Sequence, residues 1–124
     1  MYQYLLVFIG GGLGTMMRHA VNVASARWFG TDFPYHTLFE NVTGSFLMGV
    51  VVGYFAFRGE ASQHVRLFLA TGVLGGYTTF SAFSLDAAMF VERHAWAIAS
   101  LYALASVAGA VLGLFLGLAL MRRS

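Results

Sequence analysis

Four long apolar runs, separated by short polar connections, set the pattern of this chain. No charged side chain occurs in residues 1–17, 41–57, 67–85 and 95–121. Each run is near the roughly 20 residues that a helix needs to cross a bilayer. The pattern therefore predicts a single all-α membrane domain over residues 1–124, with four spans at about residues 2–27, 36–57, 65–91 and 95–121.

The composition supports a membrane protein and excludes several other classes. Of the 124 residues, 59% are hydrophobic and only 10% are charged, which is outside the usual balance of a soluble domain. The turns between the runs leave no room for a catalytic domain, so we predict that the protein is not an enzyme. The absence of cysteine excludes disulfides and thiolate metal sites. A net charge of +2 with scattered arginines argues against nucleic-acid binding.

The arginines give little preference for one orientation in the membrane. With four spans, the two sides of the bilayer would carry Arg58, Arg66, Arg122 and Arg123 against Arg18, Arg27 and Arg93. The positive-inside rule needs a clearer asymmetry than this to fix orientation. Either the chain inserts both ways and pairs with an inverted copy of itself, or one orientation prevails for another reason. The first alternative predicts an antiparallel, dual-topology homodimer.

Three of the runs contain glycines spaced for close helix contact. The patterns are Gly10-Gly-Gly-Leu-Gly14, Gly49-Val-Val-Val-Gly53 and Gly109-Ala-Val-Leu-Gly113-Leu-Phe-Leu-Gly117. Small residues let helix backbones approach each other in a membrane, where lipid provides no hydrophobic drive for association. We interpret these patterns as helix-packing faces.

The third run has an unusual interior. Gly75 and Gly76 are followed by the β-branched pair Thr78 and Thr79, about a third of the way along the span. One interpretation is a broken helix, whose freed carbonyls would suit a hard cation such as sodium. Such a break is tolerated only where protein buries it or where it lines a cavity. The other interpretation is an unbroken helix whose glycines pack against a neighbour.

Polar and aromatic positions from three spans suggest one path through the membrane. Phe80 and Phe83 share a helix face, and a phenyl ring has a positive edge that can stabilise a small anion. Hydroxyl and amide groups can replace part of the water shell of such an ion. The candidate lining residues are Asn41, Thr79, Phe80, Ser81, Phe83, Ser84, Tyr102 and Ser106.

Three motifs resemble the signatures of the Fluc/CrcB fluoride channels. They are Gly11-Gly-Leu-Gly-Thr-Met-Met-Arg18, Thr37-Leu-Phe-Glu-Asn41-Val-Thr-Gly-Ser-Phe46 and Gly75-Gly-Tyr-Thr-Thr-Phe-Ser-Ala-Phe-Ser84. The resemblance extends over the whole chain. It implies a dual-topology homodimer in the inner membrane of bacteria, with two fluoride pores and a central sodium ion held by backbone oxygens at the subunit interface.

The resemblance also implies roles for particular residues. Gly75 and Thr78 would supply the sodium-binding carbonyls, and Phe80 and Phe83 the ring edges of the pore. Asn41 would be a vestibule donor. Tyr102 and Ser106 resemble the polar positions of the fourth span, and Arg18 resembles the arginine of the first, with a vestibule or structural role.

Four residues depart from the pattern of the family. Ala82 replaces a usual threonine, Asp86 a frequent glutamate and His36 a usual glycine, and Glu40 stands where an apolar residue is common. A carboxylate beside Asn41 would repel an anion if it faced the same way. Successive helix positions lie about 100° apart, so we expect Glu40 to face a neighbouring helix or the interface.

These observations predict a fluoride-selective channel for passive efflux. The chain has no phosphate-binding glycine loop that would couple transport to ATP. Two alternatives remain. A proton-coupled small multidrug exporter would want an acidic residue deep in the first span, and none precedes Arg18. A non-transporting structural subunit would account for the glycine faces, but it leaves the hydroxyl-rich third span unexplained.

Overall fold

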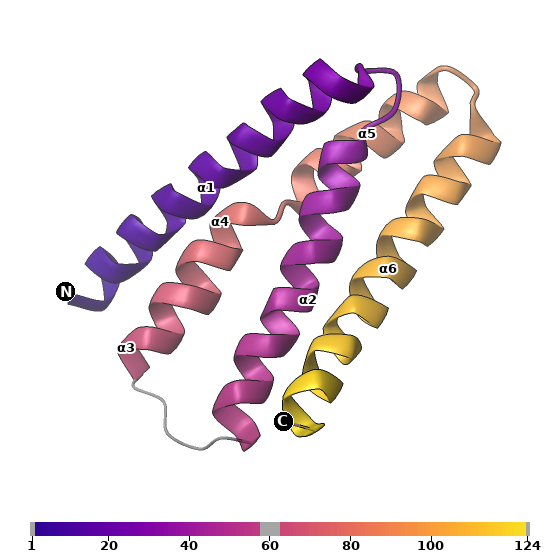
Figure 1. The fold of residues 1–124 in the computed structure, drawn as a ribbon. Helices are drawn as coiled ribbons and strands as arrows, with labels where there is room; N and C mark the ends of the chain where they lie inside the picture. The colour runs from indigo at the N-terminus through magenta and orange to yellow at the C-terminus, as the bar shows by residue number, and fades with distance from the viewer. Residues whose placement is uncertain (1, 58–62, 124) are drawn as a thin grey trace.

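The computed structural model describes residues 2–57 and 63–123, and these residues form helices and short connections without a strand (Figure 1). Three helices are continuous: α1 (Tyr2–Phe29), α2 (Tyr35–Phe57) and α6 (Trp96–Arg123). The described residues between α2 and α6 form a composite rod, which is built from several helical segments. It consists of α3 (Gln63–Arg66), the π-helix η1 (Leu67–Leu74), α4 (Gly75–Tyr77) and, after an interruption, α5 (Phe80–Glu92).

The helix ends follow from local turn chemistry. Gly30 ends α1 with a φ of 77°, a conformation that glycine adopts without steric cost, and its amide donates to Ala26 O at 3.2 Å. Pro34 stands directly before α2, where a missing amide hydrogen is tolerated. The turn between α5 and α6 places His94 at a φ of 61°. Each helical rod lies within two residues of the predicted spans at both ends.

The composite rod has two different packing partners. Its first half, η1 and α4, packs mainly along α1, whereas α5 packs on α6 (Figure 1). The most extensive helix pair is α2 with α6. The interruption thus allows one rod to pack against α1 below the break and against α6 above it.

The predicted glycine faces are confirmed as contacts between helices of one chain. A side chain at Gly10 would stand 2.7 Å from Phe68 O of η1, and one at Gly53 would stand 2.9 Å from Met121 of α6. The glycines of α6 lie against α2, where a side chain at Gly117 would overlap Phe46 O. Gly10 and Gly117 therefore require glycine because backbone lies directly opposite them, whereas Gly53 faces the Met121 side chain.

Much apolar surface of the chain is exposed, as expected of a membrane protein. By length and composition, α2 and α6 are each apolar enough to cross a membrane. Leu104 and Leu112 of α6 are 68% and 67% exposed, and Phe115 is 61% exposed. Exposed apolar area on this scale marks contact with lipid or with another subunit.

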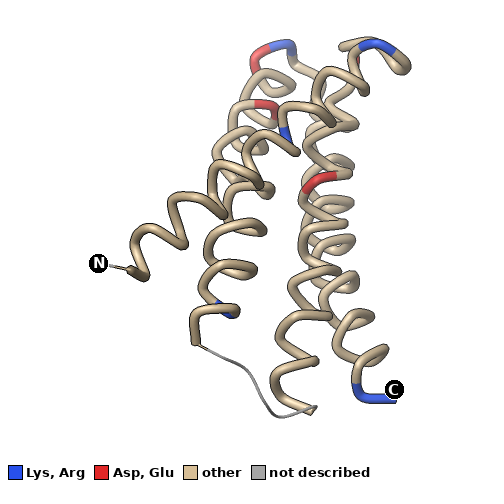
Figure 2. Tube along the Cα trace, turned by 60° about the vertical axis from the view of Figure 1, so that its left-hand side comes forward, with Lys and Arg blue, Asp and Glu red and all other residues tan. Residues whose placement is uncertain are grey.

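Charged residues lie mainly toward the ends of the bundle (Figure 2). The acidic segments of the described residues all lie in the half that contains the connection between α1 and α2. Arg18 is an exception to the predicted placement of arginines at the ends, because its Nε donates to Gly76 O at the interruption. Its charge therefore does not count toward the loop asymmetry. Arg58 lies outside the described residues.

Candidate functional site

The third rod is interrupted at Thr78 and Thr79, whose backbones are extended. Their φ and ψ angles are −88° and 159° for Thr78, and −153° and 121° for Thr79. Thr79 also caps the second half of the rod, because its Oγ1 accepts from the Ala82 amide at 3.2 Å. The broken-helix interpretation is thus correct.

The position of the break differs from the prediction. It lies near the middle of the rod, between Gln63–Tyr77 and Phe80–Glu92, and not a third of the way along. The glycines themselves stay helical, and Gly76 packs directly on the backbone of Gly11 in α1. The two threonines take the extended conformation; the Thr78 amide still donates to Leu74 O at 3.0 Å, whereas a neighbouring helix supplies the backbone partners of Thr79.

Asn41 of α2 clamps the break with two hydrogen bonds. Its Nδ2 donates to Thr79 O at 2.9 Å, and its Oδ1 accepts from the Thr79 amide at 2.8 Å. This is the pairing that one strand residue would offer another, supplied here by a side-chain amide. Asn41 therefore satisfies both backbone groups of the residue at which the helix is broken.

The first helix supports the other side of the break. Arg18 Nε donates to Gly76 O at 3.0 Å, and Thr15 Oγ1 lies 3.5 Å from the same oxygen. A third contact joins Thr43 Oγ1 of α2 to the Tyr77 hydroxyl at 3.0 Å. The interruption is thus held by side chains of both α1 and α2, as expected for irregular backbone at membrane depth.

Two carbonyls at the break lose their helical partners. In an unbroken helix, Gly75 O would accept from the Thr79 amide and Thr78 O from the Ala82 amide. Those amides instead donate to Asn41 Oδ1 and Thr79 Oγ1. Both carbonyl oxygens are thereby available to another ligand, and Gly75 is exposed on the surface of the single chain.

A pocket of about 240 Å³ lies beside the break. The candidate residues that line it are Asn41, Thr79, Phe80, Phe83 and Ser106, together with Ser45, Thr78, Val107 and Ala110. The rings of Phe80 and Phe83 have centroids 5.6 Å apart at an interplanar angle of 42°. Ser106 Oγ is buried, and it has no hydrogen-bond partner among the described residues. The pocket thus combines the Phe80 and Phe83 rings with the Ser106 hydroxyl, which is available to bind an ion.

Three other candidate residues do not line this pocket. Tyr102 is fully buried, and its hydroxyl donates to Asp86 Oδ2 at 2.9 Å, while its ring packs 5.2 Å from that of Phe83. Ser81 and Ser84 are exposed on the face of α5, and Ser81 Oγ is 3.3 Å from Thr79 Oγ1. Within one chain, the predicted lining residues therefore do not form one continuous path, because Tyr102, Ser81 and Ser84 lie outside the pocket.

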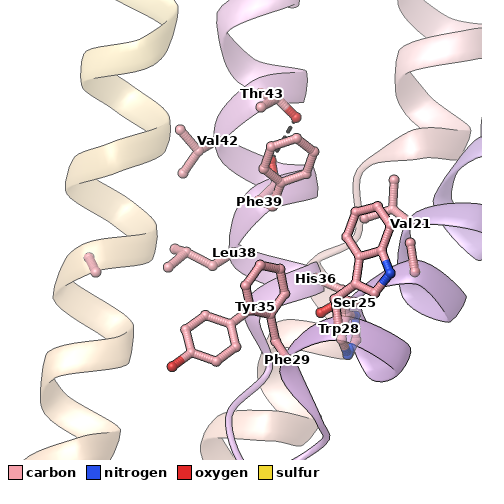
Figure 3. A pocket seen from close by; sticks show the side chains of 12 residues that line it. Val21, Ser25, Trp28, Phe29, Tyr35, His36, Leu38, Phe39, Val42 and Thr43 are labelled. Atoms are coloured by element: carbon pink, nitrogen blue, oxygen red, sulfur yellow. Dashed lines mark hydrogen bonds between the residues drawn. The ribbon is translucent and has the colours of Figure 1, made fainter.

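A second pocket is apolar and lies between α1 and α2 (Figure 3). It has a volume of about 640 Å³, and Trp28, Phe29, Tyr35 and Phe39 are among its lining residues. Its polar side chains do not converge on one point, and the Thr43 hydroxyl donates a hydrogen bond to Phe39 O at 2.6 Å. This groove resembles a packing surface more than a ligand site.

Sequence reasoning missed two features of the site region. The π-helical stretch η1 carries no local signal that distinguishes it from an α-helix. Asn22 also escaped notice. With its amide oriented to face acceptors, Asn22 Nδ2 donates to Glu40 Oε2 at 2.5 Å. Glu40 is only 1% exposed, so the prediction that it faces a neighbouring helix is confirmed.

The fold and the site define a small α-helical membrane protein whose third rod is broken and clamped by neighbouring side chains. Such interruptions are where membrane proteins place ion and substrate sites. The chain belongs to the CrcB family, since the family described as "CrcB-like protein, Camphor Resistance (CrcB)" matches residues 5–118.

Named relatives cover nearly the whole chain. A protein of Rhodopseudomonas palustris (strain BisB5) named "Fluoride-specific ion channel FluC" is 67% identical over 119 residues, or 96% of each chain. "Fluoride-specific ion channel FluC 2" of Nitrobacter hamburgensis is 63% identical over 120 residues, or 97% of each chain. The FluC protein of Granulibacter bethesdensis is 52% identical over 122 residues, which are 98% of this chain and 96% of that protein.

Proposed function

We propose that this protein is a fluoride-selective channel that lets fluoride leave the bacterial cell passively across the inner membrane. The relatives named as fluoride-specific ion channels support the ion, and they match this chain almost from end to end. The observation that carries the proposal is the pocket beside the clamped break. It places the Phe80 and Phe83 rings next to Asn41 and Ser106.

This combination suits a small anion that holds its water tightly. Ring edges and hydroxyls each replace a modest part of the hydration shell, so the ion can enter without being trapped. A lysine in the pocket would bind the ion too firmly for rapid passage, and none lines it. Narrow spacing would exclude larger halides by size.

The driving force is the membrane potential. With the cell interior negative, it moves an anion outward by roughly 2.3 kcal/mol per 100 mV. Flow is therefore electrogenic and needs no coupling to ATP or protons. Efflux of this kind would protect a cell that takes up fluoride as the neutral acid.

The functional unit is an antiparallel homodimer of four-span subunits. The exposed pore residues support this, since Phe80 is 76% exposed in the single chain and Ser81 and Ser84 lie on the same exposed element. A second copy would cover them and complete the path along Ser81, Ser84 and Tyr102. The weak arginine asymmetry allows the inverted copy to insert.

A sodium ion would stabilise this interface. The Gly75 and Thr78 carbonyls fit it, because their helical amide partners bond elsewhere and hard cations prefer oxygen ligands. When bound, the ion would hold two breaks together across the two-fold axis. Arg18 keeps the neighbouring Gly76 carbonyl engaged, so that it does not compete as a ligand.

The alternatives are less well supported. A proton-coupled exporter would want a carboxylate in α1, and Tyr2–Phe29 has no aspartate or glutamate. A structural subunit leaves the Asn41 clamp and its pocket without a role. Membership of the CrcB family also favours the channel.

The test is fluoride efflux from liposomes that contain the purified protein. A fluoride electrode would record release after a potassium ionophore is added, with chloride-loaded vesicles in parallel. We expect rapid fluoride release that requires the ionophore and little chloride release. Phe80→Ala should abolish most of the flux, whereas Leu104→Ala, a matched change at a position that is 68% exposed on α6, should not. Equal loss in both variants, or no release from dimeric wild-type protein, would refute the proposal.

A further inference from the structure

A polar cluster of partly buried side chains around the buried Glu40 joins α1 to α2. His36 and Glu40 are four residues apart on α2 and therefore share a face. Asn22 of α1 reaches both, because its Nδ2 donates to Glu40 Oε2 at 2.5 Å and to His36 Nδ1 at 2.9 Å. The same nitrogen is 3.1 Å from Arg18 O. One amide thus connects an imidazole and a carboxyl group in the interior.

The carboxyl group of Glu40 is only half satisfied. Its side chain is 1% exposed, and Oε1 is buried without a hydrogen-bond partner among the described residues. A buried carboxylate with an unpaired oxygen is costly, and binding of a proton removes its charge. Oε1 of Glu40 is therefore the atom of the cluster that is suited to binding a proton.

The charged neighbours of Glu40 oppose one another. Arg18 of α1 attracts the carboxylate, but its Nε is committed to Gly76 O. Asp86 of α5 repels it, and Asp86 in turn accepts the Tyr102 hydroxyl of α6. Glu40 thus has no ion-pair partner among the described residues.

A small cavity lined by both polar and apolar residues borders the cluster. It has a volume of about 160 Å³ near the connection between α1 and α2. Asn22 and His36 line it, together with Asp32, Asp86 and Arg93. His36 lines this cavity, and Glu40 lies one helical turn further along the same face of α2.

We propose that Glu40, reached through His36 and Asn22, is a proton-binding site that makes fluoride passage faster at lower pH. Glu40 immediately precedes Asn41, which clamps the break and lines the pocket. An ionised carboxylate there raises the energy of an anion in the pocket, and a bound proton removes that repulsion. This inference deepens the proposed channel function and rests on it.

The experiment measures fluoride efflux from liposomes between about pH 6 and about pH 8.5, a range in which buried glutamate side chains can bind and release a proton. We expect wild-type flux to rise roughly threefold or more toward the acid end, since low-dielectric surroundings strengthen the repulsion. Glu40→Gln keeps the shape and an acceptor for Asn22, so its flux should be independent of pH and close to the wild-type value at the acid end. Glu92→Gln, at the exposed end of α5, should keep the wild-type profile.

A flat wild-type profile, or a pH slope that Glu40→Gln retains, would overturn the proposal. Infrared difference spectra between the two pH values provide a second readout. The wild type should gain a protonated-carboxyl band that the variant lacks, and its absence would also refute the proton site. Wild-type protein without fluoride flux at any pH would refute the channel function instead, while the infrared band would still decide whether Glu40 binds a proton.

Discussion

Replacing Asn41 with alanine should destabilise the protein and stop fluoride flux together. The substitution removes the bonds of 2.9 Å and 2.8 Å that satisfy Thr79 O and the Thr79 amide. Hydrogen bonds between membrane helices contribute about 1 kcal/mol each, so the pair is worth about 2 kcal/mol. A change of this size shifts the population with an intact break by roughly thirtyfold.

The assay compares unfolding and flux in the same preparations. Reversible denaturation in mixed detergent micelles would give the free energy of unfolding, and the liposome efflux assay would give the rate of transport. Ser106→Ala is the matched control, because Ser106 lines the same pocket and has no hydrogen-bond partner among the described residues. We expect the control to keep wild-type stability and to lose only part of the flux.

Two results would refute this reasoning. If Asn41→Ala unfolded within about 0.5 kcal/mol of the wild type, the two bonds would contribute nothing net to the fold. If it lost stability but transported fluoride at the normal rate, the clamp would not be needed for the pore.

Three further predictions follow from the geometry. Gly117→Ala should lower the free energy of unfolding by about 1–3 kcal/mol, because backbone of α2 lies directly opposite Gly117. Gly12→Ala, with open space around it, should leave the free energy of unfolding unchanged. Thermal denaturation of both variants would test this difference. Tyr102→Phe leaves Asp86 without its donor and should destabilise the protein by about 1–3 kcal/mol in the same denaturation assay, and unchanged stability would count against that bond. Replacing sodium in the buffer with a large organic cation should weaken the dimer, as measured by light scattering; an unaffected dimer would argue against the proposed ion.

The long helices and the glycine faces were predictable because each depends on local pattern. A run of apolar residues of sufficient length specifies a membrane helix, whatever surrounds it. Gly49 and Gly117 stand in regular spacings that reveal close packing without any knowledge of the partner. Those predictions needed only residue type and interval.

The exact break could not be predicted, because its cause lies elsewhere in the chain. Gly75 and Gly76 have the weakest helical propensity, yet they remain helical, while Thr78 and Thr79 leave the helix. Asn41, 38 residues away from Thr79, supplies the bonds that compensate for this. Propensity therefore located the region, and a long-range contact fixed the residue.

Helical spacing predicted some contacts among the candidate residues and missed others. Helical spacing correctly paired Phe80 with Phe83, whose rings lie 5.6 Å apart. The same spacing placed Tyr102 beside Ser106, but the hydroxyl of Tyr102 turns to Asp86 instead. Helical periodicity gives the face of a residue, and only the neighbouring helices determine where a long side chain ends.

The interruption in the third rod also bears on the order in which the chain is made. Ribosomes synthesise α1 and α2 before residues 75–79, so Arg18 and Asn41 enter the bilayer before the residues at the break do. Their side chains supply the donors and the acceptor for Gly76 and Thr79. The hydrogen-bond partners for the break are thus already in the bilayer when the break enters it. This order of insertion shortens the time that unpaired backbone spends in lipid.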